Sequence, residues 1–263
     1  TENRDPRLSQ SIRTPGYKRI GGTAYQAPDL GHTVTGYHMT KYMQGIDLEV
    51  DLYGASYNDL PVFRAAEVIL NFAEAKAELG TLTQADLDKS IKLLRNRVGM
   101  PNIDLAAANA NPDPYLLAAE TGYPNVTGSF TGVILEIRRE RAVELFDENF
   151  RYYDIMRWKN GQAFTHPLLG FYVPGPGSYD LDNDGNVDVC FYEGTAPSGL
   201  AATVVKLQIG KDIVLTEGNK GCIYANHNDP GKWNEDRDYY YPIPTDEISL
   251  TDGALVQNKG WEI

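Results

Sequence analysis

The stretch ILEIRRERAVELFDENFRYYDIMRW, residues 134–158, carries the strongest helical signal in the chain and decides much of its fold. It is dense in arginine and acidic residues, which suits a helix with ion pairs along its surface. Asn149 divides it, because asparagine is the non-glycine residue that best accepts the left-handed backbone of a helix end. The stretch therefore predicts two consecutive helices, separated at Asn149.

A further helix is predicted upstream, over residues 63–80, FRAAEVILNFAEAKAELG. Pro61 suits its first turn and Gly80 suits a left-handed stop. Apolar side chains recur at three- and four-residue intervals and should share one buried face. These side chains are Phe63, Ala66, Ile69, Leu70, Ala73 and Ala77.

A partner helix follows almost at once, over residues 83–98. Thr83 and Asp86 match a capping box at its start, and Gly99 ends it. Its apolar stripe consists of Leu87, Ile91, Leu94 and Val98. Two helices joined so closely form an antiparallel pair like a single tetratricopeptide (TPR) unit, but no second clear copy follows.

The rest of the chain is rich in glycine and proline, which predicts turns and loops. Strand-like alternation is weak, and the best candidates are residues 186–193, 202–209 and 211–215. We therefore expect a mainly α fold with long ordered loops and a few short strands. The expected organisation is a single domain over residues 1–263, with a loop-rich segment 1–60, a helical core 61–160 and a second loop-rich segment 161–263.

The charge balance excludes some partners. Lys and Arg total 24 and Asp and Glu total 36, a net charge of −12. Such a surface repels phosphate backbones, so we expect no nucleic-acid partner. No apolar run approaches the roughly 18 residues of a membrane-spanning helix.

The two cysteines, Cys190 and Cys222, are either small buried hydrophobes or one disulfide.

Short motifs occur in order along nearly the whole chain. They are DPRL (5–8), TGYHMTKY (35–42), RAAEVILNFAEAKAELG (64–80), RNRVGMP (95–101), IRRERAVELFDENFRYYDIMRW (137–158), YYYPIPTDEI (239–248) and LVQNKGW (255–261). This set resembles the C-terminal half of SusD-like (RagB/SusD) proteins, surface glycan-binding lipoproteins of Bacteroidetes. The resemblance implies a portion of the SusD-like α-α superhelix with its TPR-like pair.

The same resemblance implies a function and a place. Such a chain would capture oligosaccharide or polysaccharide without catalysis at the outer face of the outer membrane, and would deliver it to a SusC-like TonB-dependent transporter. Family members usually have glycine where Asn149 and Phe150 stand here. They also carry a lipidated N-terminal cysteine and a helical-repeat half, so the lipid anchor is expected in an N-terminal part outside this chain. Trp158 and Trp261 lie in family motifs and are interpreted as packing residues, whereas Trp233 is left open.

The segment DLDNDGNVD, residues 180–188, resembles the front of an EF-hand loop. Alternate carboxylates and a glycine at the turn are the pattern that holds Ca²⁺. The predicted ligands of a structural calcium ion are Asp180, Asp182, Asp184, Asn186 through its backbone carbonyl, and Asp188 directly or through water. The twelfth position is Phe191 rather than Glu, so Glu193 is the nearest candidate for a bidentate ligand. The alternative is an Asx-rich turn without an ion.

Glu140 and Glu144, one helical turn apart, have the spacing of a candidate catalytic carboxylate pair. They lie among arginines at helical spacing, which favours ion pairing over acid catalysis. The sequence contains no GxSxG, HExxH or P-loop motif, and its four histidines are scattered. We therefore expect a protein that is not an enzyme.

Aromatic side chains in the N-terminal loops suit sugar binding, because sugar rings stack on tyrosine while their hydroxyls seek polar groups. SusD-like proteins place part of their glycan site in loops of this region. The predicted glycan-binding residues are Tyr17, Tyr25 and Tyr37, with Arg13 and His38 as polar contacts. Two alternatives stay open: a calcium-stabilised carbohydrate-active enzyme, which needs two cleft carboxylates free of arginine, and a helical scaffold for protein or peptide partners, which would bury all three tyrosines.

Overall fold

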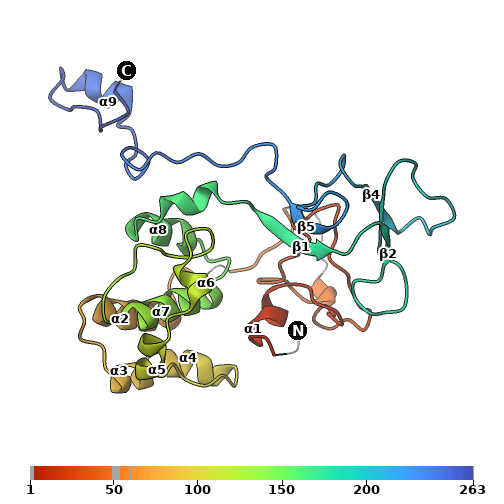
Figure 1. The fold of residues 1–263 in the computed structure, drawn as a ribbon, viewed down its shortest axis with the longest axis horizontal. Coiled ribbons are helices and arrows are strands. Elements are labelled where there is room, and N and C mark those ends of the chain that lie inside the picture. The colour runs from red at the N-terminus through yellow and green to blue at the C-terminus, as the bar shows by residue number, and fades with distance from the viewer. Residues whose placement is uncertain (1–2, 49–53, 60, 263) are drawn as a thin grey trace.

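The computed structural model describes residues 3–48, 54–59 and 61–262. Helices α2 to α8 gather on one side and the strands on the other (Figure 1). In the helical lobe α2 (Ala65–Glu78) packs against α7 (Thr131–Glu144). The other helices of this lobe are α3 (Gln84–Lys89), α4 (Ile91–Arg97), α5 (Leu105–Ala110), α6 (Pro114–Leu117) and α8 (Phe150–Arg157). The architecture is mainly α, as predicted.

The helix predicted over residues 63–80 begins later than its apolar pattern suggested. Arg64 is extended, with φ −142°, and carries its guanidinium to Glu148 and to α7. Phe63 therefore lies outside α2 and is 84% exposed, so its prediction as a core residue was wrong. Leu70 and Ala73 are fully buried, as the pattern predicted.

The partner helix is divided into α3 and α4 at Ser90. The Ser90 hydroxyl donates to the carbonyl of Asp86 at 2.7 Å, which competes with the helical hydrogen bonding of this turn. The capping box at the start of α3 is present, because Thr83 and Asp86 each accept a backbone N–H of the other. At the other predicted boundary, Asn149 has φ +63° and precedes α8.

The strand lobe contains two small sheets. In one, β1 (Leu169–Val173) pairs antiparallel with β5 (Gly221–Tyr224). In the other, β3 (Val189–Tyr192) lies between β2 (Gly177–Tyr179), antiparallel, and β4 (Val205–Gln208), parallel. Two of these strands lie within the predicted ranges, whereas residues 211–215 form only isolated bridges. Cys190 and Cys222 lie in different sheets as free thiols.

Each lobe has its own buried core. In the strand lobe that core consists of Leu30, Val173, Val189, Phe191, Leu215 and Ile223. In the helical lobe it is larger and includes Leu70, Leu87, Ile91, Leu135 and Ile137. Burial of these apolar side chains stabilises each lobe, by about 1.5–3 kcal/mol for a large side chain.

The N-terminal segment connects the two lobes. α1 (Arg7–Ser11) lies beside α7, and the Arg7 guanidinium donates to Glu140 at 2.6 Å. Immediately after α1, Ile12 pairs with Met39 in an isolated antiparallel bridge on the side of the strand lobe. A short 3-10 helix, η1 (Ile46–Leu48), follows before the chain enters the helical lobe.

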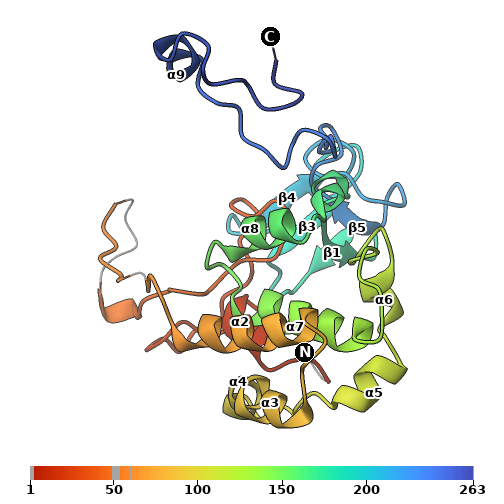
Figure 2. The ribbon, with the colours of Figure 1, turned by 90° about the vertical axis from the view of Figure 1, so that its left-hand side faces the viewer.

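The C-terminal segment, which ends beyond α9 (Thr245–Leu250), extends away from both lobes (Figure 1 and Figure 2). It is attached at η2 (Gly161–Thr165), where the Trp233 ring lies between Phe164 and Tyr239. A Cβ on Gly161 would lie 1.9 Å from that ring, so only glycine fits there. Trp233 is therefore a packing residue. Among the described residues, no helix combines the length and apolar character that a bilayer crossing requires.

Candidate functional site

An open groove of about 880 Å³ lies between the N-terminal segment and the strand lobe. This volume falls in the range of small-molecule sites. Aromatic and aliphatic side chains dominate its walls, and Arg4 and Arg13 are its charged residues. The lining residues include Arg4, Arg13, Tyr37, Met39, Leu168, Leu169, Phe171, Tyr172, Tyr179 and Leu181. No carboxylate lines the groove in the part of the chain that the structure describes.

Two glycines let the N-terminal loop lie directly on β1. The Phe171 amide donates to the Thr35 carbonyl at 3.0 Å. A Cβ on Gly170 would lie 2.2 Å from that same carbonyl oxygen, and a Cβ on Gly36 would lie 2.1 Å from the Phe171 ring. Gly36 also has φ +77°, a conformation that favours glycine. This close contact brings the loop residue Tyr37 to the strand lobe.

The aromatic rings of the groove contact one another. Tyr37 meets Phe171 edge to face, with centroids 6.5 Å apart, and Phe171 meets Phe191 in the same way. The Tyr179 hydroxyl donates to the Gly175 carbonyl at 2.8 Å. Tyr37 is 47% exposed and Tyr172 is 55% exposed. The groove therefore offers accessible ring faces held by a packed aromatic base.

The structure brings two of the five predicted glycan-binding residues into the groove, namely Arg13 and Tyr37. Tyr17 is half-buried beneath the Arg13 guanidinium, and Tyr25 is exposed beneath the Lys18 ammonium, and neither lines this groove. His38 is half-buried and accepts the Asp29 amide on Nδ1 at 3.2 Å. Burial and the nearby Arg13 charge lower the pKa of His38.

Sequence reasoning missed the opposite wall of the groove. Phe171 and Tyr172 belong to β1, and Tyr179 to β2, neither of which was predicted as a strand. The pairing of β1 is irregular between Leu169 and Tyr172, so its side chains do not alternate simply between the two faces. The signal available was the apolar run LLGFYV, residues 168–173, followed at once by Pro and Gly.

The acidic loop 180–188 joins β2 to β3, and its Leu181 lines the groove. The carboxylates of Asp180, Asp182 and Asp188 converge, with candidate ligand oxygens within 4.8 Å of one another. Asp184 is outside this group, and its carboxylate accepts the backbone and side-chain N–H groups of Asn186. The Asp182 carbonyl accepts the Gly16 amide at 2.8 Å, which connects the loop to the N-terminal segment.

The pKa values of Asp182 and Asp180 are shifted in opposite directions. Burial raises the pKa of Asp182, and the neighbouring Asp188 charge raises it further. Burial would also raise the pKa of Asp180, but the amides of Gly185 and Asn183 hold it below its usual range. Asp182 is 3% exposed, so ionising it beside Asp188 is unfavourable without a counter-charge.

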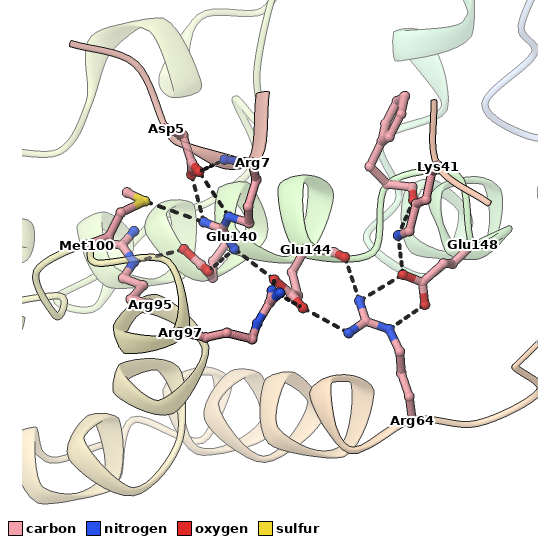
Figure 3. A network of polar contacts seen from close by, with 11 residues as sticks. Asp5, Arg7, Lys41, Arg64, Arg95, Arg97, Met100, Glu140, Glu144 and Glu148 are labelled. Atoms are coloured by element: carbon pink, nitrogen blue, oxygen red, sulfur yellow. Dashed lines mark hydrogen bonds and ion pairs between the residues drawn. The ribbon is translucent and has the colours of Figure 1, made fainter. Parts of the chain in front are cut away.

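Glu140 and Glu144 of α7 form an ion network with arginines from three other segments (Figure 3). Glu140 binds Arg7 and Arg95, at 2.6 and 2.8 Å. Glu144 binds Arg7, Arg64 and Arg97 at 2.7 to 2.9 Å. Burial would raise the pKa of Glu144, but hydrogen bonds from Arg64 and Arg7 lower it below its usual value. The predicted ion pairing is therefore present, and both carboxylates are committed to it.

Comparison with known proteins identifies the family. The model of the SusD family matches residues 1–261, so the chain belongs to the SusD family. No curated protein matches the sequence.

Two solved structures share the fold. One is a SusD-like protein from Bacteroides fragilis, with a TM-score of 0.60 and 22% identity over 98% of this chain. The other is a SusD-like carbohydrate-binding protein from Bacteroides fragilis, with a TM-score of 0.58 and 23% identity over 95% of this chain. The chain spans 39% and 41% of the lengths of these two proteins.

Proposed function

We propose that this chain contributes to non-catalytic binding of an oligosaccharide or polysaccharide, and that the ligand lies in the groove between the N-terminal segment and β1. The groove itself carries the proposal, because it combines exposed tyrosine faces with ample volume. Sugar rings stack on such faces through their apolar C–H surfaces. One SusD-like structure with the same fold is described as carbohydrate-binding, which supports the same ligand class here.

Binding is favoured over hydrolysis by the chemistry of the groove. Glycosidases place two carboxylates on either side of the scissile bond. The described residues of this groove include none, and Glu140 and Glu144 are bound to arginines elsewhere. A protein-only scaffold is less favoured, because Tyr25 and Tyr37 are exposed rather than buried.

In the cell, we propose that the protein acts in nutrient uptake on the extracellular face of the outer membrane, held by a lipid anchor. There it would pass its glycan to a SusC-like TonB-dependent transporter. Membership of the SusD family supports this placement. Co-purification with such a transporter from detergent-treated outer membranes tests it.

The binding function is tested by a glycan array followed by calorimetry. We expect at least one soluble glycan to bind, and Tyr37→Ala to weaken that binding by roughly 5- to 150-fold, since stacking on one aromatic ring contributes about 1–3 kcal/mol. Tyr25→Ala is the matched control, because this exposed tyrosine lies outside the groove. Equal losses of affinity in both variants would argue against the groove as the binding site. Release of reducing ends would argue against a non-catalytic role.

We further propose that Ca²⁺ binds the acidic loop and has a structural role. Asp180, Asp182 and Asp188 would supply carboxylate oxygens, which are the ligands that this hard cation prefers. The buried Asp182 fits such an ion, because a cation would neutralise the repulsion that raises its pKa. Asp184, directed to Asn186, is left without a direct role in this arrangement.

A further inference from the structure

Most arginines of this protein are bound to carboxylates. Among the described residues, ion pairs hold Arg7, Arg64, Arg95, Arg97, Arg138, Arg139, Arg141, Arg157 and Arg237. This pairing is expected in a chain with a net charge of −12, where carboxylates are plentiful. An arginine that forms no ion pair with a carboxylate therefore requires an explanation.

Both arginines of the groove lack an ion pair with any described residue. Arg13 donates from Nη1 to the Ala27 carbonyl at 2.8 Å, while its buried Nε has no hydrogen-bond partner. Asp29, whose charge acts on the pKa of Arg13, is paired with His32 at 2.7 Å. Arg4 is exposed at the groove. The groove thus holds two guanidinium groups that form no ion pair with a described residue.

The other side chains of the groove are apolar, aromatic or hydroxylic. Sites for neutral sugars need acceptors as well as donors, because each sugar hydroxyl is both. This groove offers charged donors and no carboxylate acceptor among the described residues. Arginine forms strong, often bidentate hydrogen bonds with anionic oxygens.

We propose that the glycan bound in this groove is anionic, and that Arg13 and Arg4 bind its sugar carboxylates or sulfate esters while the tyrosines stack on its rings. This inference rests on the proposed function. It adds a selection by charge. A neutral glycan of the same shape would be excluded, because its binding would leave Arg13 desolvated and without an ionic partner.

The test compares charged and neutral forms of the same oligosaccharide by calorimetry. One pair is trigalacturonate and its fully methyl-esterified form, which isolates the carboxylate. The other is an oligo-κ-carrageenan and its chemically desulfated form, which isolates the sulfate. We expect one charged form to bind at least about tenfold more tightly than its neutral counterpart, with affinity that falls as salt is raised.

Variants assign the preference to the groove. Arg13→Gln should remove most of the difference between charged and neutral forms, Arg13→Lys should retain part of it, and Arg4→Gln, on an exposed side chain, should reduce it without affecting the melting temperature. Arg151→Gln is the control, because Arg151 donates to the Tyr123 hydroxyl outside the groove. A neutral form that binds as well as its charged counterpart would overturn this inference and leave glycan binding intact. If no glycan of either kind binds, both this inference and the proposed glycan-binding function are wrong.

Discussion

Glu140 and Glu144 illustrate how neighbouring charges decide what a carboxylate does. Their spacing of one helical turn resembles that of paired acids, but buried guanidinium groups surround both. Burial would raise the pKa of Glu144, but hydrogen bonds from Arg64 and Arg7 hold it below its usual value, so this carboxylate has no proton to donate near neutral pH. Its value is structural, because the network ties α1, α2 and α4 to α7.

We expect Glu144→Gln to lower the free energy of unfolding by about 3–5 kcal/mol, since it leaves the buried Arg7 with less of its counter-charge. Chemical denaturation measures this. Glu217→Gln makes the same change at an exposed pair with Lys220, 3.8 Å apart, and should cost less than about 1 kcal/mol. Similar losses in both variants would contradict a structural role for the network.

At the scale of elements, the groove depends on how one loop meets one strand. The loop around Gly36 contacts β1 without an intervening side chain, because neither Gly36 nor Gly170 has a Cβ. The β-carbon of Ala at Gly36 would overlap the Phe171 ring, which in turn contacts the buried Phe191. A substitution in the loop should therefore disturb the core of the strand lobe.

We expect Gly36→Ala to destabilise the protein by about 1–3 kcal/mol more than Gly16→Ala does. The two glycines have similar backbones, with φ +77° and +83°, so the strain of a left-handed alanine is common to both variants. Only Gly36 has a ring at 2.1 Å, whereas Gly16 has open space. Equal melting temperatures would show that the loop is not held against β1 in this way.

The helices are the elements that the sequence predicts best. The Thr83–Asp86 capping box and the left-handed Asn149 depend on residues within one or two turns, so local chemistry suffices. The break at Ser90 depends on a single hydroxyl bond and has no comparable pattern. The start of α2 depends on Arg64 reaching Glu148, a contact between residues far apart in sequence.

At the scale of the whole molecule, the acidic loop and the groove are mechanically connected. Leu181 lines the groove, and the adjacent Asp182 carbonyl holds the Gly16 amide of the N-terminal segment. An ion bound by Asp180, Asp182 and Asp188 would therefore fix one wall of the groove relative to the other.

We expect Ca²⁺ at about 100 times its Kd to stabilise the protein by about 2.7 kcal/mol, which raises the melting temperature by roughly 5–10 °C over the chelated protein. Asp182→Asn should abolish this response, and Asp184→Asn, outside the converging group, should retain it. In chelator, Asp182→Asn should melt no lower than the wild type, because it removes the repulsion by Asp188. A response lost equally in both variants would contradict the assignment of ligands.

The sequence by itself determined the helical segments that contain α2, α7 and α8, the acidic loop and the membership of the SusD family, because these depend on periodicity, capping and motifs read along the chain. It also identified Arg13 and Tyr37 as binding candidates. Only the tertiary structure decided that Tyr37 meets Phe171 while Tyr17 and Tyr25 lie elsewhere. The groove unites segments more than a hundred residues apart through glycine contacts, and no local pattern in a sequence records which distant backbone will pass against a glycine.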